Sequence, residues 1–166
     1  MVGKKEIDDV MRKVKSWLIE DGLYKDKLID DNADYHYITV FPAESQQIVD
    51  VIHPKQLTDM IVIGSGISLS DEHYKALKST PKPEKDKFLW DLRYQLLFRD
   101  SEFYMLPSAE DLREFRFARP LYFDGLTKNA FMEALRENFK CKLFVIWKID
   151  QFLGESSPSS LGKIYG

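Results

Sequence analysis

The sequence predicts an α+β fold: a two-layer sandwich in which helices pack on a five-stranded antiparallel sheet. Three observations lead to this prediction. First, short runs of β-branched and aromatic residues are bounded by turn residues. Second, segments with helical periodicity lie between and around these runs. Third, the runs are joined by short turns or by a broken helix, whereas a parallel pair of strands would need an intact crossover helix. The expected order is α-β-β-β-α-β-β-α, in a single domain over residues 1–153.

The N-terminal third predicts one helix followed by an antiparallel meander. Six apolar residues recur at helical spacing before Gly22, which is a stop signal: Ile7, Val10, Met11, Val14, Trp17 and Leu18. The polar segment "DKLIDDNAD" is expected to be a connection. Three strands with short turns are then expected at "YHYITVF", "QQIVDVIHP" and residues 57–63.

The rest of the chain predicts a broken helix, a second antiparallel pair and a long last helix. Ser68 or Ser70 can cap a helix, and Pro81 and Pro83 then prevent one continuous helix from forming. The expected elements are a helix over 70–79, a helix over 86–100, strands at "SEFYML" and "EFRFARPLYF", and a helix from Thr127 to about Phe152. The Gly/Ser/Pro-rich tail, residues 154–166, is expected to be disordered.

The composition argues against several classes of protein. Lys plus Arg is 24 and Asp plus Glu is 27, so the net charge of −3 gives no support for nucleic-acid or anionic-membrane binding. The single cysteine, Cys141, can form no intramolecular disulfide and no four-cysteine zinc site. No run of about 18 apolar residues occurs, and the N-terminus has no apolar signal segment. We therefore expect a soluble, cytoplasmic protein.

Two features suggest a ligand site, and each has a simpler interpretation. Gly64 and Gly66 suggest a phosphate loop, but Leu69 stands where a dinucleotide fingerprint needs its third glycine, and Ile67 where a P-loop needs lysine. We expect glycines that let the chain bend from strand to helix. The three histidines are His36, His53 and His73; they show no close metal-ligand spacing, and the first two share a face only in one strand register. The sequence thus predicts no catalytic residue, no cofactor and no metal.

The helix over residues 86–100 is apolar on two sides. Phe88, Leu89, Leu92 and Leu96 cluster in one arc, and a second cluster lies opposite: Trp90, Tyr94, Leu97 and Phe98. One sheet can cover only one of these sides. Aromatic residues are enriched in interface cores, so the second cluster is a candidate partner or dimer interface. The alternative is that the last helix of the same chain covers it.

The segments "WLIEDG", "DMIVIGSGISLSDEH" and "YFDGLTKNAF", in this order, resemble an archaeal family of uncharacterised proteins. The fold of that family is similar to the type III secretion chaperone-like superfamily. The resemblance covers roughly residues 1–153. It implies a compact sandwich with a five-stranded antiparallel sheet, which is often dimeric in the wider superfamily, and it transfers no catalytic residue. In secretion chaperones, sheet and helix surfaces bind an extended segment of another protein.

These observations favour a non-enzymatic, partner-binding or chaperone-like adaptor that is homodimeric. The motivation is the doubly apolar helix together with the absence of any catalytic motif. The alternative is a small-molecule-binding protein or enzyme with a pocket near Gly64, Gly66 and His73.

Overall fold

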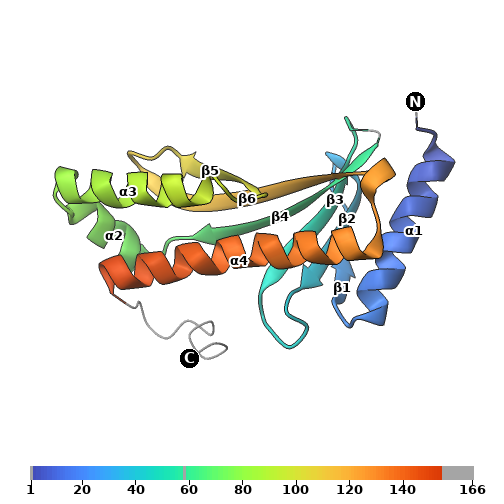
Figure 1. Ribbon diagram of the computed structural model, residues 1–166, viewed down its shortest axis with the longest axis horizontal. Coiled ribbons are helices and arrows are strands. Elements are labelled where there is room, and N and C mark those ends of the chain that lie inside the picture. Colours follow the sequence, from blue (N-terminus) through green and yellow to red (C-terminus); the bar gives the residue numbers. More distant parts are fainter. Residues whose placement is uncertain (1, 58, 155–166) are drawn as a thin grey trace. The chain divides into compact units, whose positions relative to one another are not determined.

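The computed structural model describes residues 2–57 and 59–154 (Figure 1). The predicted disorder of residues 155–166 lies outside the described residues. The helices are α1 (Lys4–Glu20), α2 (Asp71–Ser79), α3 (Lys82–Leu96) and α4 (Lys128–Leu153), with a short 3-10 turn at Phe123–Gly125. The strands are β1 (Tyr24–Lys27), β2 (Ala33–Val40), β3 (Ile48–Pro54), β4 (Met60–Ser68), β5 (Glu102–Pro107) and β6 (Leu112–Tyr122).

Over the described part of the chain, the strands form one six-stranded antiparallel sheet in the order β1-β2-β3-β4-β6-β5. The α+β class is confirmed, and the prediction of five strands is wrong. The additional strand is β1, which pairs antiparallel with β2 in the segment expected to be a connection. Three of its four residues, "YKDK", are exposed, so it shows no apolar alternation. A charged edge strand of this kind forms through backbone hydrogen bonds to its neighbour, which leave no hydropathy pattern.

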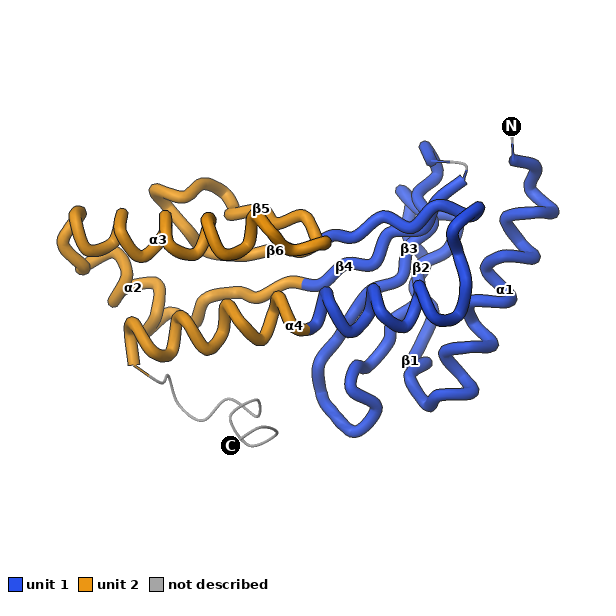
Figure 2. The backbone as a smooth tube through the Cα atoms, viewed as in Figure 1, with its two compact units in different colours: residues 1–65, 118–139 blue, residues 66–117, 140–166 orange. Residues whose placement is uncertain are grey.

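The chain divides into two compact units (Figure 2). The first comprises residues 1–65 and 118–139, and the second comprises 66–117 together with the described residues from 140 onward. Strands β4 and β6 and helix α4 contribute residues to both. Each unit has its own buried apolar cluster. That residues 1–153 act as a single domain stays a prediction.

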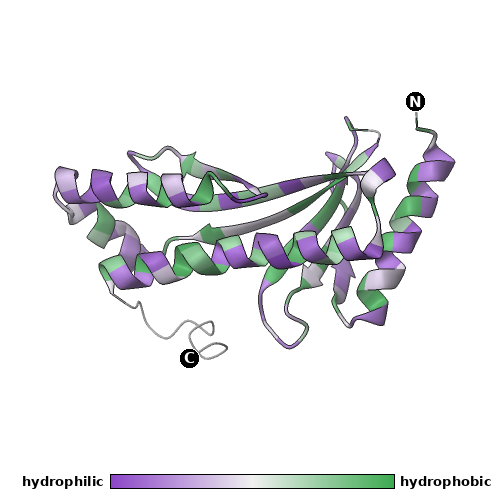
Figure 3. Ribbon diagram, in the orientation of Figure 1, coloured by the Kyte–Doolittle hydropathy of each residue, from purple (hydrophilic) through white to green (hydrophobic). Residues whose placement is uncertain are grey.

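The core of the first unit is built on the predicted face of α1. Residues coloured as hydrophobic and hydrophilic alternate along this helix (Figure 3), and its buried side chains are Ile7, Met11, Val14, Trp17 and Leu18. Trp17 also contacts Phe131 of α4, with ring centroids 5.8 Å apart. Gly22 ends the helix with a φ of +68°, while Leu23 N donates to Leu18 O at 2.7 Å. This is the Schellman arrangement, which favours glycine, so the predicted stop at Gly22 is confirmed.

A buried polar bridge joins β4 to α4 within the first unit. The Ser65 hydroxyl donates to Oδ1 of Asn138 at 2.6 Å, and Nδ2 of Asn138 donates to the Ile63 carbonyl at 3.4 Å. Asn138 is fully buried and Ser65 nearly so. Since buried polar groups are costly when they lose their partners, this bridge ties α4 to the sheet at one position.

Replacing Asn138 with Leu should therefore destabilise the protein although the side chains are similar in size. The hydroxyl of Ser65 would be left buried without its acceptor, and a penalty of about 1–3 kcal/mol is typical for such a loss. Denaturant unfolding measures it. The double variant Asn138→Leu/Ser65→Ala should recover part of the loss, because it removes both partners. No recovery would contradict this account of the bridge.

His36 of β2 lies between two carboxylates in the first unit. Its Nδ1 is 2.9 Å from Oδ2 of Asp30, and its Nε2 is 2.9 Å from Oδ1 of Asp50 on β3. Burial by itself lowers the pKa of His36, but the hydrogen bonds to Asp50 and Asp30 outweigh it, so the pKa is raised above 6.5. The protonated imidazole can donate to both carboxylates at once, whereas the neutral ring can donate to only one.

The stability of the protein should consequently contain a pH-dependent contribution from His36. Because the pKa of His36 is higher in the folded protein than in the unfolded chain, the protonated form stabilises the fold. This contribution is complete below the unfolded pKa of about 6.5 and is lost as the pH rises through the folded pKa. We expect the difference in unfolding free energy between wild type and His36→Asn to narrow as the pH rises from about 6.5 through the raised pKa of His36 in the folded protein. Denaturant unfolding at a series of pH values measures it, with Asp50→Asn as an intermediate variant. A gap of constant size would contradict the prediction.

The core of the second unit contains side chains from β6, α2, α3 and α4. Helix α2 is capped by Ser70, whose hydroxyl accepts from His73 N at 3.1 Å, in agreement with one of the two predicted caps. Helix α3 begins at Lys82, four residues earlier than expected. Pro83 does not break the helix, because it lies in the first turn. Backbone N–H groups of the first turn have no partner within a helix, so the N–H that proline lacks costs no helical hydrogen bond.

Candidate functional site

One side of helix α3 is packed into the core of the second unit. Leu89, Leu92 and Leu96 are 4%, 1% and 1% exposed, and they share a buried cluster with side chains of β6 and α4. Phe88 stacks on Phe152 of α4 with ring centroids 4.1 Å apart and planes nearly parallel. Helix α4 therefore covers the arc of α3 that carries Phe88.

The opposite side of α3 is uncovered in this chain. Its large side chains are 52% to 85% exposed, and we call them the α3 apolar face: Trp90, Tyr94, Leu97 and Phe98. The rings of Trp90 and Tyr94 contact each other at 5.7 Å between centroids. These are the four residues that the sequence predicts as a partner or dimer interface. The alternative, cover by the last helix of the same chain, is wrong because α4 packs on the other arc.

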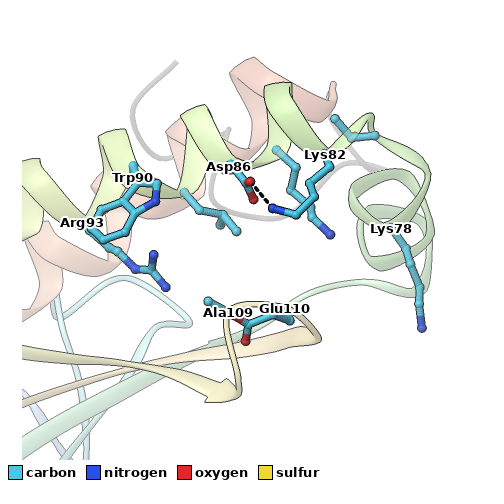
Figure 4. Close-up of a pocket in the computed structure, with 10 residues that line it drawn as sticks. Lys78, Lys82, Asp86, Trp90, Arg93, Ala109 and Glu110 are labelled. Carbon is cyan, nitrogen blue, oxygen red and sulfur yellow. Dashed lines mark hydrogen bonds and ion pairs between the residues drawn. The ribbon is translucent and has the colours of Figure 1, made fainter.

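A cavity of about 490 Å³ opens beside the α3 apolar face (Figure 4). We call it the basic cleft. It lies within the second unit, between α3, the end of α2 and the turn that joins β5 to β6. Its lining residues are Lys78, Thr80, Lys82, Lys85, Asp86, Leu89, Trp90, Arg93, Ala109 and Glu110. Trp90 belongs to the cleft and to the apolar face, so the two surfaces are continuous.

The charges in the basic cleft are unbalanced. Its lining contains four cationic side chains and two carboxylates, a net charge of +2, whereas the whole chain has a charge of −3. Lys82 pairs with Asp86 one turn further along α3. Arg93 lies over the ring of Trp90, with Cζ 4.6 Å from the centroid. Within the described residues neither Arg93 nor Lys85 has a carboxylate at ion-pair distance, so both cations are available to a ligand.

Comparisons with known proteins bear on what this site can be. A family model described as "Uncharacterized conserved protein (DUF2299)" matches residues 10–149. The chain belongs to the DUF2299 family. The resemblance to an uncharacterised archaeal family is thereby confirmed. A crystal structure of an uncharacterized protein from Methanothermobacter thermautotrophicus is 28% identical, covers 87% of this chain and 99% of its own, and superposes with a TM-score of 0.81.

Other comparisons add less. The crystal structure of YbjN from E. coli is 12% identical, covers 87% of this chain and 88% of its own, and has a TM-score of 0.45, too low to support any argument. The search of curated proteins gave no match. The DUF2299 assignment thus brings a fold and a family but no site, and the residues themselves have to indicate the function.

The wall of the cleft opposite α3 is held by a cluster centred on Tyr74 of α2. The Tyr74 hydroxyl donates to Oδ1 of Asp111 at 2.6 Å and accepts from Nη2 of Arg113 at 2.7 Å. The Arg113 guanidinium also lies 3.9 Å from the centre of the Tyr74 ring. Hydrogen bonding from Tyr74 is the largest of the influences that lower the pKa of Asp111. The cluster ties the end of the β5–β6 turn, and with it Ala109 and Glu110, to α2.

The glycines that suggest a loop are strand residues. Gly64 and Gly66 lie inside β4, which continues to Ser68, and neither has a positive φ. The expected bend between strand and helix is therefore wrong at these positions. His73 is buried and its Nε2 lies 2.8 Å from the Gly154 carbonyl oxygen. Neither glycine nor His73 lines the basic cleft.

The histidines do not come together. Tyr35 of β2 pairs with His53 of β3, so His36, the next residue along β2, points to the other face of the sheet. His53 is 1% exposed, its ring is tilted against that of Phe123 with centroids 5.9 Å apart, and its Nδ1 lies 3.4 Å from Oδ2 of Asp34. Among residues 2–57 and 59–154, no group of three potential ligands could hold a metal ion. No helix in the same ranges is long and apolar enough to cross a membrane.

The basic cleft is the feature that sequence reasoning missed. Lys82, Lys85 and Arg93 are ordinary surface residues in the sequence, and only folding places them opposite the β5–β6 turn. A weak signal existed, because Lys82, Lys85, Asp86 and Arg93 have the i, i+3, i+4 and i+11 spacing of one helix face. The predicted start at residue 86 left the first two of these residues outside the helix.

Replacing Tyr74 with Phe should raise the pKa of Asp111 toward its ordinary value of 3.8, because the strongest hydrogen bond to that carboxylate is lost. Observation of the Asp111 carboxyl by NMR during a pH titration measures this change. Tyr104→Phe is the matched control, since the Tyr104 hydroxyl donates to Glu102 instead, at 2.7 Å. An unchanged Asp111 titration in Tyr74→Phe would show that Tyr74 does not organise this wall.

Proposed function

We propose that the protein is a non-enzymatic adaptor that binds other protein chains through the α3 apolar face. The observation that carries this proposal is the exposure of Trp90, Tyr94, Leu97 and Phe98 on one side of one helix. Contiguous exposed apolar surface is typical of interaction sites, and aromatic residues are enriched in interface cores. A polar cleft at the border of the patch matches the usual arrangement of an apolar centre with a charged rim.

The proposal includes a chaperone-like role in the cytoplasm. The resemblance to the type III secretion chaperone-like superfamily supports it, because chaperones of that kind bind extended segments on sheet and helix surfaces. The α+β architecture with an antiparallel sheet is compatible with this likeness. The single cysteine, Cys141, is buried in the core of the second unit, as expected for an inert thiol in a reducing compartment.

We also propose that the free protein is a homodimer, in which the α3 apolar face of one copy covers that of another. A self-complementary contact of this kind is the commonest way in which identical chains cover an apolar patch. A partner and a second copy would both need Trp90 and Tyr94, so they exclude each other. Self-association would then keep the face out of water until a partner binds.

The basic cleft also raises the possibility of a small-molecule site, since its volume of about 490 Å³ is in the range of ligand pockets. Its lining argues against that use. Seven of its ten residues are polar or charged, and the apolar ones are Leu89, Trp90 and Ala109. Small-molecule pockets are mostly apolar with a few polar groups, so this cleft is better suited to the rim of a protein contact.

The double variant Trp90→Glu/Tyr94→Glu should dissociate the homodimer. It would place two carboxylates in an apolar contact, where unpaired charges are strongly unfavourable, while both positions are exposed in the single chain and tolerate charge there. Light scattering should show the mass of the wild type halved in the variant. Circular dichroism should show the fold retained.

The matched control is Ile19→Glu/Tyr122→Glu, which changes two side chains of similar exposure, 57% and 52%, in the first unit. This variant should stay dimeric. If the wild type is a monomer at high concentration, or if the control dissociates as readily as the test variant, the homodimer through α3 is wrong. If Trp90→Glu/Tyr94→Glu unfolds, the face is needed for the fold of the single chain and the adaptor proposal loses its support.

A further inference from the structure

We infer that the partner segment that binds α3 is acidic, with its carboxylates in the basic cleft and its apolar side chains on the α3 apolar face. This inference rests on the proposed function and names the chemistry of the partner. Its starting point is Trp90, which lines the cleft and is also part of the apolar face. A segment of another chain that contacts Trp90 therefore reaches both surfaces.

Arg93 is the central residue of the inferred site. It lies one turn after Trp90 on α3 and is half-buried, and its guanidinium lies over the indole ring with Cζ 4.6 Å from the centroid. In Figure 4 its side chain extends from α3 toward the turn at Ala109 and Glu110. Stacking holds the planar group in one orientation without using its N–H donors. A stacked guanidinium with free donors is well prepared to bind a carboxylate through two hydrogen bonds.

Lys85 supplies a second free cation in the same cleft. It is half-buried and, like Arg93, has no ion-pair partner among the described residues. The remaining cations are engaged: Lys82 pairs with Asp86, and Lys78 donates to the Tyr74 hydroxyl at 2.9 Å. Of the two carboxylates in the cleft, Glu110 has no ion-pair partner among the described residues. The site thus offers two unpaired cations against one unpaired carboxylate, and an anionic ligand would restore the balance.

Charge complementarity selects an acidic partner over a second copy as the preferred occupant. In a self-complementary contact each copy would bring its own Lys85 and Arg93 to the interface, so the number of unpaired cations would double. An acidic segment satisfies these cations and covers the same apolar residues. The local charge of +2 on a chain of charge −3 would also orient such a segment toward α3 as it approaches.

The test is a selection from a library of random peptides of about a dozen residues displayed on bacteriophage, with the full-length protein as the bait. Three variants are run beside the wild type: Lys85→Glu/Arg93→Glu in the cleft, Trp90→Ala/Tyr94→Ala on the face, and Lys25→Glu/Lys140→Glu as the control. The control makes the same change in net charge at two exposed lysines outside the cleft, one in each unit, that have no ion-pair partner among the described residues. Thermal melting confirms that each variant is folded.

We expect the wild type and the control to enrich peptides that combine aspartate or glutamate with aromatic or aliphatic residues. A synthetic peptide of the enriched sequence should bind Lys85→Glu/Arg93→Glu at least about tenfold more weakly than it binds the control, as is typical when a buried charge pair at an interface loses one partner. Its affinity for the wild type should fall as salt is raised. If the charge reversal unfolds the protein, Lys85→Gln/Arg93→Gln replaces it, with the same direction of change expected.

The other outcomes separate the inference from the proposed function. If the wild type enriches apolar peptides without an acidic bias, or if the cleft variant binds the peptide as well as the control does, the acidic partner is wrong and the adaptor proposal stands. If nothing is enriched, or if Trp90→Ala/Tyr94→Ala binds the enriched peptides as well as the wild type does, both are wrong.

Discussion

The exposed surface of α3 depends on one contact, the burial of Leu89, Leu92 and Leu96 of this helix in the core of the second unit. These side chains are between 1% and 4% exposed, and they pack in one cluster with Leu112, Phe115 and Phe117 of β6. A helix buries one stripe against one layer, so this contact sets the rotation of α3 about its own axis. The second apolar stripe of α3 must then point away from the core. Helix α4 packs on the side of α3 that carries Phe88, and no other described element covers the second stripe. The exposed aromatic face is a consequence of how the helix is held.

The same rotation produces the basic cleft. Arg93 lies on the flank of α3 between the buried and the exposed stripe, and Lys85 lies one turn before Leu89. Both line the cleft together with the turn between β5 and β6. That turn is held in place by Tyr74, Asp111 and Arg113 through hydrogen bonds of 2.6 and 2.7 Å, so the opposite wall of the cleft is a fixed surface. The apolar face and the cleft are therefore parts of one surface that meet at Trp90. A ligand that uses only one of them leaves either apolar area in water or cations unpaired.

Polar groups have two different roles in this protein. Some are paired internally: in the first unit Asn138 bridges Ser65 and the Ile63 carbonyl, and His36 lies between Asp30 and Asp50. In the second unit, Tyr74 joins Asp111 and Arg113. Others, Arg93 and Lys85 in the basic cleft, have no acidic partner among residues 2–57 and 59–154. Internal pairing stabilises a fold and contributes little to recognition, whereas free cations beside an aromatic surface cost little in water and become useful when a partner arrives. This contrast supports the proposal that the recognition surface of this DUF2299 protein lies in the second unit.

Local sequence signals determined most of the elements. The apolar spacing in α1, its stop at Gly22, the Ser70 cap and the two-sided character of α3 all depend on residues within a few positions of each other, and each can be read from the sequence. Strand β1 could not be predicted from the sequence, because a charged edge strand forms through backbone hydrogen bonds to β2 and needs no apolar pattern. Only the tertiary structure decided which stripe of α3 is covered, and only it brought Lys85 and Arg93 to the turn at Glu110. These outcomes depend on packing between segments far apart in the chain, and the free energy of such packing is absent from any local stretch of residues.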